Sequence, residues 1–281
     1  MLHPKIGFIG AGKVGCTLGK YLSGRGLHIY GYYSRTAGSA EEAAAFTQSE
    51  NLTFEEAVRG SDLLFLTVPD AALAEVWARV RALPVEGKTL CHCSGLYSSR
   101  VFQGAEQAGA QGFSLHPLCA VHDSWSSYRQ MDRVYFTLDG AGESRHMQTL
   151  LAHLENPVEA IDPANKARYH AAAVFFSNLV IGLAKTGTDL FLECGLREDF
   201  AQNAWRSLFL KNAENAAGAG LADALTGPVE RGDALSVRKH IDCLAEPARG
   251  IYISLSKQLV AVARQKHPER DYAPIEEVLK A

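Results

Sequence analysis

Polar side chains suited to acid–base chemistry follow two apolar runs of this 281-residue chain. Ser94 comes directly after Thr89–Cys93, and His116 comes directly after Gly112–Leu115. Because the carboxyl ends of parallel strands meet at one edge of a sheet, we expect both residues at that edge. A histidine can exchange a proton near neutral pH, and a serine hydroxyl can orient a substrate oxygen or nitrogen. The sequence therefore predicts both as catalytic, with a simple backbone contact as the alternative for His116.

A second polar group interrupts a later apolar stretch. His170 and Ser177 are seven residues apart and share a helix face, and Asn178 lies about 80° further round. Burying such groups without partners is costly, so they should meet each other, a cofactor or a substrate. We predict His170 and Asn178 as catalytic and Ser177 as substrate-binding, with hydrogen bonding between helices as the alternative.

A polar loop near residue 230 offers one more substrate contact. Arg231 could bind a carboxylate or a phosphate. Asp233, close by, is expected chiefly to cap the helix that follows it.

The elements that position these residues fall into two patterns. Up to about Asp139, short apolar runs alternate with helical segments, which indicates βαβ units around a doubly wound parallel sheet, a Rossmann α/β fold. The predicted strands are 6–9, 28–33, 63–68, 89–93, 112–115 and 134–138. Two S/T-x-x-E capping boxes, Ser39 with Glu42 and Thr53 with Glu56, predict helix starts.

After Ile161 only helical patterns remain. Asp162 and Pro163 are typical of a helix start, and the next stop signal is Gly195, which predicts one helix of about 32 residues. Further helices are expected over 197–217, 234–245 and 247–267. We therefore predict a Rossmann domain over 1–160 and an all-helical domain over 161–281.

A glycine-rich segment lies between the first predicted strand and the first helix. Gly10, Gly12 and Gly15 fit the roles of a tight turn, close pyrophosphate approach and helix packing, with Lys13 and Val14 at the helix start. The helix N-terminus would face the phosphates. This context predicts dinucleotide binding, with a purely structural turn as the alternative.

The end of the second predicted strand indicates which dinucleotide binds. An NAD domain usually carries Asp or Glu there, whereas this chain has Ser34, Arg35 and Thr36. Arg35 can form charge-assisted hydrogen bonds with a 2′-phosphate, which predicts NADP as the cofactor. Val68 and Pro69, after the strand 63–68, should line the nicotinamide half of the site. Asp70 could cap the next helix.

Composition favours small-molecule partners. A net charge of −3 with 21% charged residues gives no basic excess for nucleic acid or anionic membranes. The N-terminus shows no export signal, and Ala171–Ala184 reads as too short and polar to span a bilayer. Six cysteines without a CxxC pair suit a cytoplasmic protein. Cys91, His92 and Cys93 lack a second ligand cluster, so no metal is expected.

The predicted helix of about 32 residues also suggests an oligomeric state. It is apolar on most sides through its middle, so it should be surrounded by protein. We therefore expect a homodimer formed through the helical domain.

Seven motifs along the chain carry a resemblance to a known superfamily. They are GFIGAGKVG, YSRT, TVPD, CSG, LHP, YHAAAVFFSN and LTGPVERGD. The chain resembles NADP-dependent dehydrogenases whose helical second domain is like that of 6-phosphogluconate dehydrogenase, including pyrroline-5-carboxylate, ketopantoate and prephenate-type enzymes. It looks most like a bacterial group of Rossmann-like NADP oxidoreductases whose second domain has no assigned function.

The resemblance implies roles for particular residues. The glycines and Ser34–Thr36 would bind NADP, and Ser94 and His116 match the substrate-contacting Ser and catalytic His of prephenate-type dehydrogenases. Hydroxyacid dehydrogenases carry a Lys four residues before the helix Asn, where this chain has Val174 before Asn178. His170 or Lys166 would have to replace that lysine.

Two functions follow as hypotheses. The first is an NADP(H)-dependent oxidoreductase that moves a hydride to or from a small polar ketone or alcohol, or an imine or amine. The second is a non-catalytic sensor or assembly protein that responds to NADP(H) occupancy. Convergence of His116 with the polar groups of the long helix would favour chemistry.

Overall fold

The computed structural model describes residues 3–140 and 142–280. Its contacts divide the chain into two compact units, Met1–Ser177 and Asn178–Ala281, which we describe separately. The first unit thus continues through helix α6 (Lys166–Phe175). The domain boundary that we predict near residue 160, where the sequence pattern changes, lies before this helix and stays a prediction.

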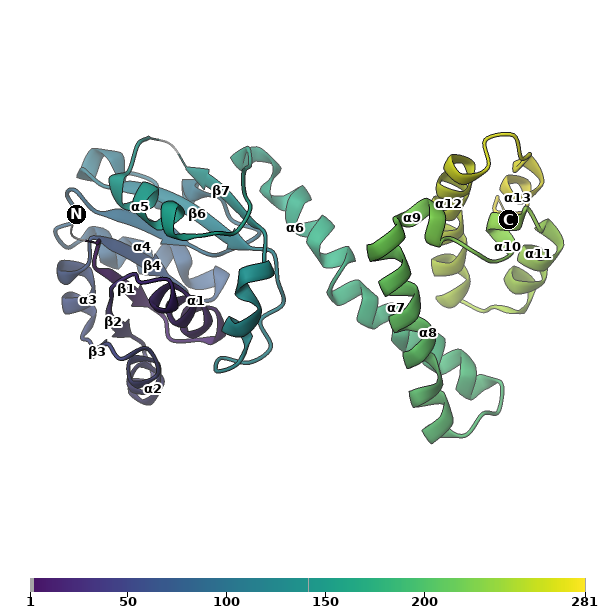
Figure 1. Ribbon diagram of the computed structural model, residues 1–281, viewed down its shortest axis with the longest axis horizontal. Coiled ribbons are helices and arrows are strands. Elements are labelled where there is room, and N and C mark those ends of the chain that lie inside the picture. The colour runs from purple at the N-terminus through teal and green to yellow at the C-terminus, as the bar shows by residue number, and fades with distance from the viewer. Residues whose placement is uncertain (1–2, 141, 281) are drawn as a thin grey trace. The chain divides into compact units, whose positions relative to one another are not determined.

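One sheet of eight strands forms the centre of the first unit (Figure 1). The strands are β1 (Ile6–Ile9), β2 (Ile29–Tyr33), β3 (Glu50–Asn51), β4 (Leu63–Leu66), β5 (Thr89–His92), β6 (Gln111–Pro117), β7 (Phe136–Gly140) and β8 (Val158–Ala160). Their order is β3-β2-β1-β4-β5-β6-β7-β8, and every pair is parallel except β6 with β7. The predicted Rossmann fold is confirmed, but apolar runs missed the short outer strands β3 and β8, whose residues are mostly exposed.

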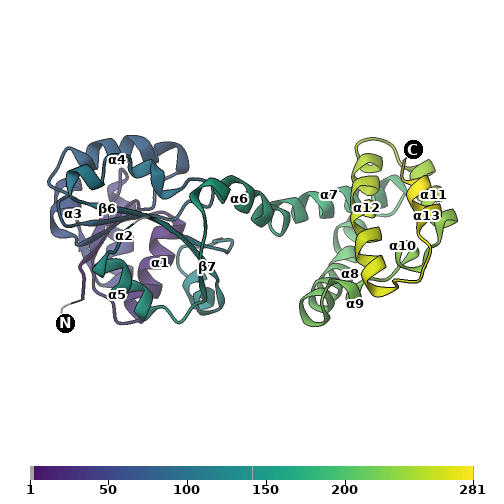
Figure 2. The same ribbon diagram turned by 90° about the horizontal axis from the view of Figure 1, so that it is seen from above.

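Helices cover both faces of this sheet (Figure 2). They are α1 (Lys13–Gly24), α2 (Ala37–Thr47), α3 (Phe54–Gly60), α4 (Leu73–Arg81) and α5 (Arg145–His153), with short 3-10 turns between them. One buried cluster joins α1, α2 and α5 to one face through residues such as Phe8 and Phe65. Another joins α3 and α4 to the other face through Ile9 and Leu64. The alternation of strand residues between two cores is what a doubly wound sheet requires.

Only one of the two predicted capping boxes exists. The Thr53 side chain accepts a hydrogen bond from the backbone N–H of Glu56, whose carboxylate accepts one from the Thr53 N–H at 2.8 Å. Ser39 was wrongly predicted as a cap, because α2 begins two residues earlier at Ala37. Ser39 and Glu42 have the spacing of a capping box but both lie inside the helix. The backbone N–H groups there already have partners, so the pair cannot act as a cap.

The predicted long helix is broken at Phe176 and Ser177. Both residues donate to carbonyls three positions back, and the Ser177 hydroxyl donates to the Ala173 carbonyl at 2.9 Å. A serine that bonds back to its own helix tends to bend it. The prediction of one continuous helix was therefore wrong, and α7 (Asn178–Glu193) starts the second unit.

The second unit contains helices only, among the residues that are described. After α7 these are α8 (Glu198–Ala219), α9 (Leu221–Ala224), α10 (Pro228–Arg231), α11 (Ala234–Cys243), α12 (Ala248–Lys266) and α13 (Ala273–Val278). A small core centred on Val237, Ile241 and Val260 joins α10 to α13. Helices α7 and α8 pack on each other but not into this core.

Candidate active site at the carboxyl edge of the sheet

The register of the strands sets the position of the site. One row crosses the five central strands and consists of Tyr33, Ile9, Leu66, His92 and Ser114. The predicted site residues begin one or two positions beyond this row on each strand, at Gly10, Ser34, Val68, Ser94 and His116. The chain leaves β1 and β4 in opposite directions across the sheet, so the crevice between these strands is a topological switch point, where open α/β sheets bind ligands.

The three glycines after β1 have three different environments. Gly10 has a φ of +109°, and a Cβ there would lie 2.4 Å from the Thr67 carbonyl oxygen. A Cβ on Gly15 would lie 2.5 Å from the Gly10 carbonyl oxygen, whereas one on Gly12 would meet nothing within 4 Å. Gly10 and Gly15 thus serve the turn and its packing, and Gly12 keeps open the space at the start of α1, which has no acidic residue in its first turn. This cradle fits a dinucleotide pyrophosphate.

The segment after β2 is basic and accessible. Arg35 and Thr36 are exposed, Ser34 is half-buried, and α2 begins just after them without a side-chain cap. These three residues offer a guanidinium and two hydroxyls where a 2′-phosphate would lie.

The loop after β5 is tied to the loop after β4. Ser94 Oγ donates to Asp70 Oδ2 at 2.9 Å and accepts from the N–H groups of Leu96 and Tyr97. A hydroxyl has one proton and two lone pairs, so these three hydrogen bonds use its full hydrogen-bonding capacity. Asp70 makes no side-chain cap, contrary to our expectation; its carboxylate holds Ser94 instead. Contact of Ser94 with a substrate stays a prediction.

The side chain of His116 meets residues of α6. Its Nδ1 lies 2.7 Å from the Tyr169 hydroxyl, and its ring centre lies 6.4 Å from that of His170. A Cβ on Gly95 would lie 2.8 Å from His116 Nε2 and 2.6 Å from His170 Cδ2. The missing side chain of Gly95 therefore leaves the room that the two imidazoles occupy. The convergence of His116 and His170 is present within the first unit.

A buried lysine anchors α6 beneath this group. The Lys166 ammonium, 2% exposed, donates to the Ser94 carbonyl at 3.0 Å and to Ser114 Oγ at 2.9 Å. It also lies 3.7 Å from a carboxylate oxygen of Asp139, which is fully buried. Burial lowers the pKa of Lys166, and the Asp139 charge opposes that shift. Lys166 was expected only as a possible replacement for the lysine of hydroxyacid dehydrogenases, and Tyr169 was not predicted. Their spacing to His170 on one helix start was the available signal.

Both histidines of the sheet edge are neutral at pH 7. Burial, followed by the positive charge of Lys166, lowers the pKa of His116 to about 3. Burial also lowers the pKa of His92 to about 4, and its two ring nitrogens contact the Ser98 carbonyl and the Ser94 N–H. We expected a histidine that titrates near neutral pH, but desolvation disfavours the imidazolium at His116.

Three predicted residues belong elsewhere or are used locally. Ser177 bonds back to its own helix, and Asn178 begins the second unit. Arg231 ends α10 of the second unit and is exposed. Asp233 caps α11 through Ser236, as expected. Site roles for Ser177, Asn178 and Arg231 stay predictions.

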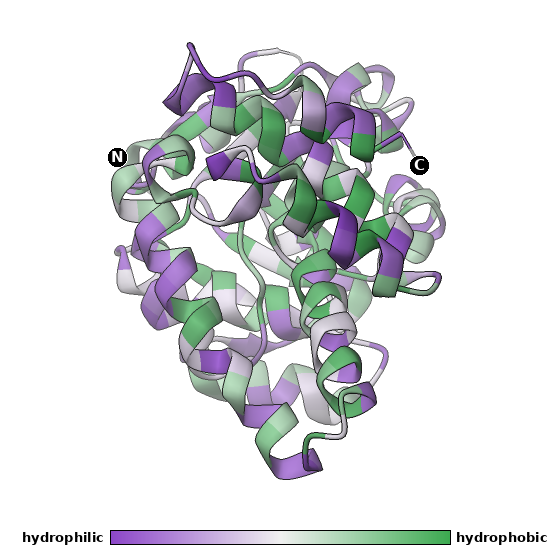
Figure 3. Cartoon of the chain, turned by 90° about the vertical axis from the view of Figure 1, so that its right-hand side faces the viewer, coloured by the Kyte–Doolittle hydropathy of each residue, from purple (hydrophilic) through white to green (hydrophobic). Residues whose placement is uncertain are grey.

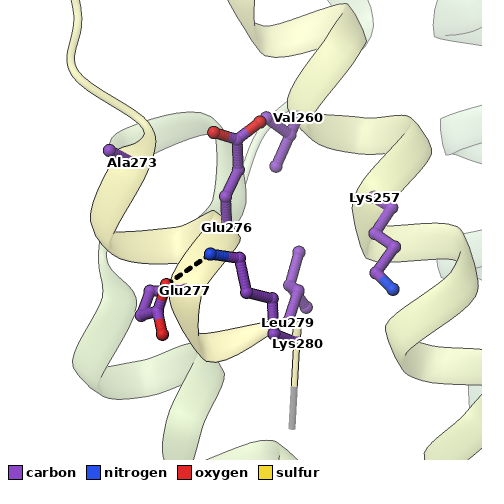
Figure 4. A pocket seen from close by; sticks show the side chains of 7 residues that line it. All are labelled: Lys257, Val260, Ala273, Glu276, Glu277, Leu279 and Lys280. Atoms are coloured by element: carbon purple, nitrogen blue, oxygen red, sulfur yellow. Dashed lines mark hydrogen bonds and ion pairs between the residues drawn. The ribbon is translucent and has the colours of Figure 1, made fainter.

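A shallow pocket of the second unit involves none of these residues. It lies between α12 and α13, where the side chains of Lys257, Glu276 and Lys280 line it (Figure 4). Lys280 pairs there with Glu277 at 2.6 Å. Both side chains are largely exposed, so the pair is a weak surface interaction.

Two known domain families account for most of the chain. Residues 2–117 match the Rossmann-like domain, and residues 134–259 match a domain of unknown function (DUF2520). The chain thus carries a Rossmann-like domain followed by a DUF2520 domain. The DUF2520 portion of this protein begins before β7, so it contributes Asp139 and all of α6 to the first unit.

Solved structures share the fold of this DUF2520 protein. A Bacteroides fragilis protein, for which an NADP oxidoreductase activity has been proposed, is 24% identical, with a TM-score of 0.69 and coverage of 92% of this chain and 98% of that one. A Thermotoga maritima protein is also 24% identical, with a TM-score of 0.73 and coverage of 93% and 99%. The Aspergillus terreus reductive aminase, solved with NADPH and ethyl-5-oxohexanoate, is 18% identical, with a TM-score of 0.63 and coverage of 98% and 99%. A search of curated proteins found no match.

The glycine cradle yields a prediction about stability. Gly10→Ala should lower the free energy of unfolding by about 1–3 kcal/mol, because it combines positive φ with a backbone clash. Gly12→Ala should change it by less than about 1 kcal/mol, since its Cβ enters open space. Urea unfolding of the two variants beside the wild type measures both. Equal losses would mean that the two glycines do not have separate roles.

Proposed function

We propose that this protein is an NADP(H)-dependent oxidoreductase that acts on a small polar ketone or alcohol, or an imine or amine. The observation that carries the proposal is the convergence of a dinucleotide cradle, His116 and His170 on one edge of one sheet. The NADP oxidoreductase activity proposed for the Bacteroides fragilis protein and the NADPH of the Aspergillus terreus structure support the same class.

The cofactor would be held by the residues that follow β1, β2 and β4. The first-turn N–H groups at Lys13 and Val14 would meet the pyrophosphate above Gly12. Arg35, with Ser34 and Thr36, would bind the 2′-phosphate. Val68 and Pro69 would line the nicotinamide half. Bound NADPH would supply the hydride and become NADP⁺, and the product oxygen or nitrogen would take a proton from water.

The substrate would lie beside Gly95. His116 Nε2 and His170 Cδ2 both lie so close to Gly95 that a Cβ there would clash with them. Either imidazole can hydrogen-bond a carbonyl oxygen or an imine nitrogen, and Ser94 shapes the loop that carries Gly95. A non-catalytic sensor does not require two imidazoles side by side, so their grouping favours an oxidoreductase over a sensor.

The cofactor assignment is tested by titration with NADPH and NADH. Arg35→Ala should weaken NADPH binding about 10- to 100-fold and leave NADH binding unchanged, because only NADPH carries the 2′-phosphate. Arg59→Ala is the matched control, since Arg59 is an exposed arginine at the opposite edge of the sheet. Binding of neither nucleotide by the wild type would refute the proposed function.

The catalytic assignment is tested by NADPH oxidation with a panel of small ketones and cyclic imines. His116→Ala and His170→Ala should each lower turnover about 100-fold or more, with NADPH affinity within a few-fold of wild type. Unchanged turnover in both variants would remove these histidines from the mechanism. NADPH binding with no substrate in the panel would favour the sensor.

We also propose that a second copy of the chain covers α7 and α8. None of the 16 residues of α7 is fully buried within the chain, and large apolar side chains are exposed along this region, including Phe176 (85%), Ile181 (71%) and Leu208 (72%). Figure 3 shows hydrophobic (green) and hydrophilic (purple) residues alternating along the helices on this side of the chain. Apolar surface on this scale marks an interaction site.

One helical run, counted through its break, also passes a length and composition test for crossing a membrane. It is Pro163–Glu193, longer than the segment considered in the sequence analysis. It carries Lys166, whose ammonium is anchored in the Rossmann unit, and the Lys185–Asp189 ion pair in its later part. Intramembrane charges are expensive, which favours a protein partner.

The dimer is tested by light scattering of the purified protein. The wild type should be dimeric, and the double variant Ile181→Glu with Leu208→Glu should be monomeric, because two carboxylates would be buried in the interface. Leu235→Glu is the control, since Leu235 is equally exposed (67%) but lies on α11. A monomeric wild type, or one that stays soluble only in detergent, would contradict the dimer.

A further inference from the structure

Helix α6 places three polar side chains against the sheet edge, and the proposed function uses only His170. Lys166 and Tyr169, almost one turn apart, point at the strands that carry His116 and Ser94. Lysines are almost never fully buried unless they are paired. Such a cation, placed beside a buried imidazole, has a chemical consequence for that imidazole.

The partner of Nδ1 determines which tautomer His116 adopts. Tyr169 Oη lies 2.7 Å from Nδ1, with the two rings nearly perpendicular at 89°. A phenol O–H is more acidic than a neutral imidazole N–H, so the phenol is the natural donor in this pair. If Tyr169 donates to Nδ1, the imidazole proton resides on Nε2. This nitrogen is the one beside Gly95.

The charges around His116 determine whether it gains a second proton. Three basic groups face it: Lys166 and His170 from α6, and His92 from the neighbouring β5. Asp139 faces Lys166 and is in contact with the Ser99 N–H through its other oxygen. The full charge that acts most on His116 is the positive Lys166, which is held by hydrogen bonds to Ser94 and Ser114. A like charge disfavours the imidazolium.

We propose that Tyr169 and Lys166 are positioning residues that hold His116 as a neutral imidazole with its proton on Nε2. The site then offers a neutral hydrogen-bond donor beside Gly95. Such a donor suits a carbonyl oxygen, which has free lone pairs. It does not suit a protonated iminium, whose nitrogen has no lone pair and is repelled by Lys166. Within the proposed function, on which this substrate preference rests, the site selects a carbonyl over a protonated iminium.

The tautomer is measured by nitrogen-15 NMR of histidine-labelled protein without nucleotide, with His116→Gln to identify the signal. In the wild type, His116 should carry its proton on Nε2 and stay neutral from pH 8 down to pH 5. Tyr169→Phe should yield a mixture of both neutral tautomers. A wild-type His116 with its proton on Nδ1, or one that titrates near pH 6.5, would overturn the proposal.

The charge effect is measured by continuing the same titration below pH 5. Lys166→Met should raise the proton affinity of His116 about tenfold, so that its titration moves to higher pH. Arg168→Met removes an exposed positive charge from the same helix and should leave the titration unchanged. Equal effects of the two variants would refute a specific role for Lys166. If Lys166→Met does not fold, the Tyr169→Phe tautomer ratio decides.

The substrate preference has its own readout. With NADPH, the protein should reduce a 2-oxo acid at least about tenfold faster than a cyclic iminium of similar size. Faster reduction of the iminium would overturn the preference. Because the NMR measurement needs no nucleotide, its failure is distinguishable from failure of the proposed NADPH binding.

Discussion

The buried ammonium of Lys166 is the interaction on which the candidate site depends. It binds the Ser94 carbonyl and the Ser114 hydroxyl, and it neutralises Asp139 on the adjacent strand. Removing one member of a buried ion pair leaves an uncompensated charge, which is strongly destabilising. The helix start is therefore fixed on the sheet edge, and Tyr169 and His170 are fixed with it. The positions of Tyr169 and His170 therefore depend on how Lys166 anchors the first turn of α6.

Much of the fold could be predicted because its determinants are local. Buried strands of a parallel sheet are continuous apolar runs, and six such runs locate β1, β2 and β4–β7. Strands β3 and β8 escaped because edge strands have few buried side chains. The break at Ser177 escaped for another reason: a serine inside a helix leaves open whether its hydroxyl bonds back to the chain. The Ser39 motif shows that spacing alone does not locate a cap.

The candidate site was predictable only in part. Gly10, Gly12 and Gly15 have environments that match their assigned roles, because the motif and the strand–helix context describe the same backbone. His116 and His170 were predicted from their types, and the structure brings their rings together. Lys166 and Tyr169 were not, since a lysine at a helix start is ordinarily solvated and only the fold shows that it is buried. Asp70 was mistaken for a cap because its actual partner, Ser94, is 24 residues away.

The matches to domain families and the compact structural units divide this chain at different places. The candidate site contains residues from both family matches but lies within one structural unit. The Rossmann-like match ends at residue 117, whereas the first compact unit continues to Ser177. Strand β7 and helix α6 belong to the DUF2520 portion but complete the sheet edge. A Rossmann domain that ended near residue 160 would keep His116 and lose its phenol partner, and it would bury the Asp139 carboxylate without a cation. The candidate site therefore draws on both domain families, and the first helix of the DUF2520 portion completes the sheet edge on which the site lies.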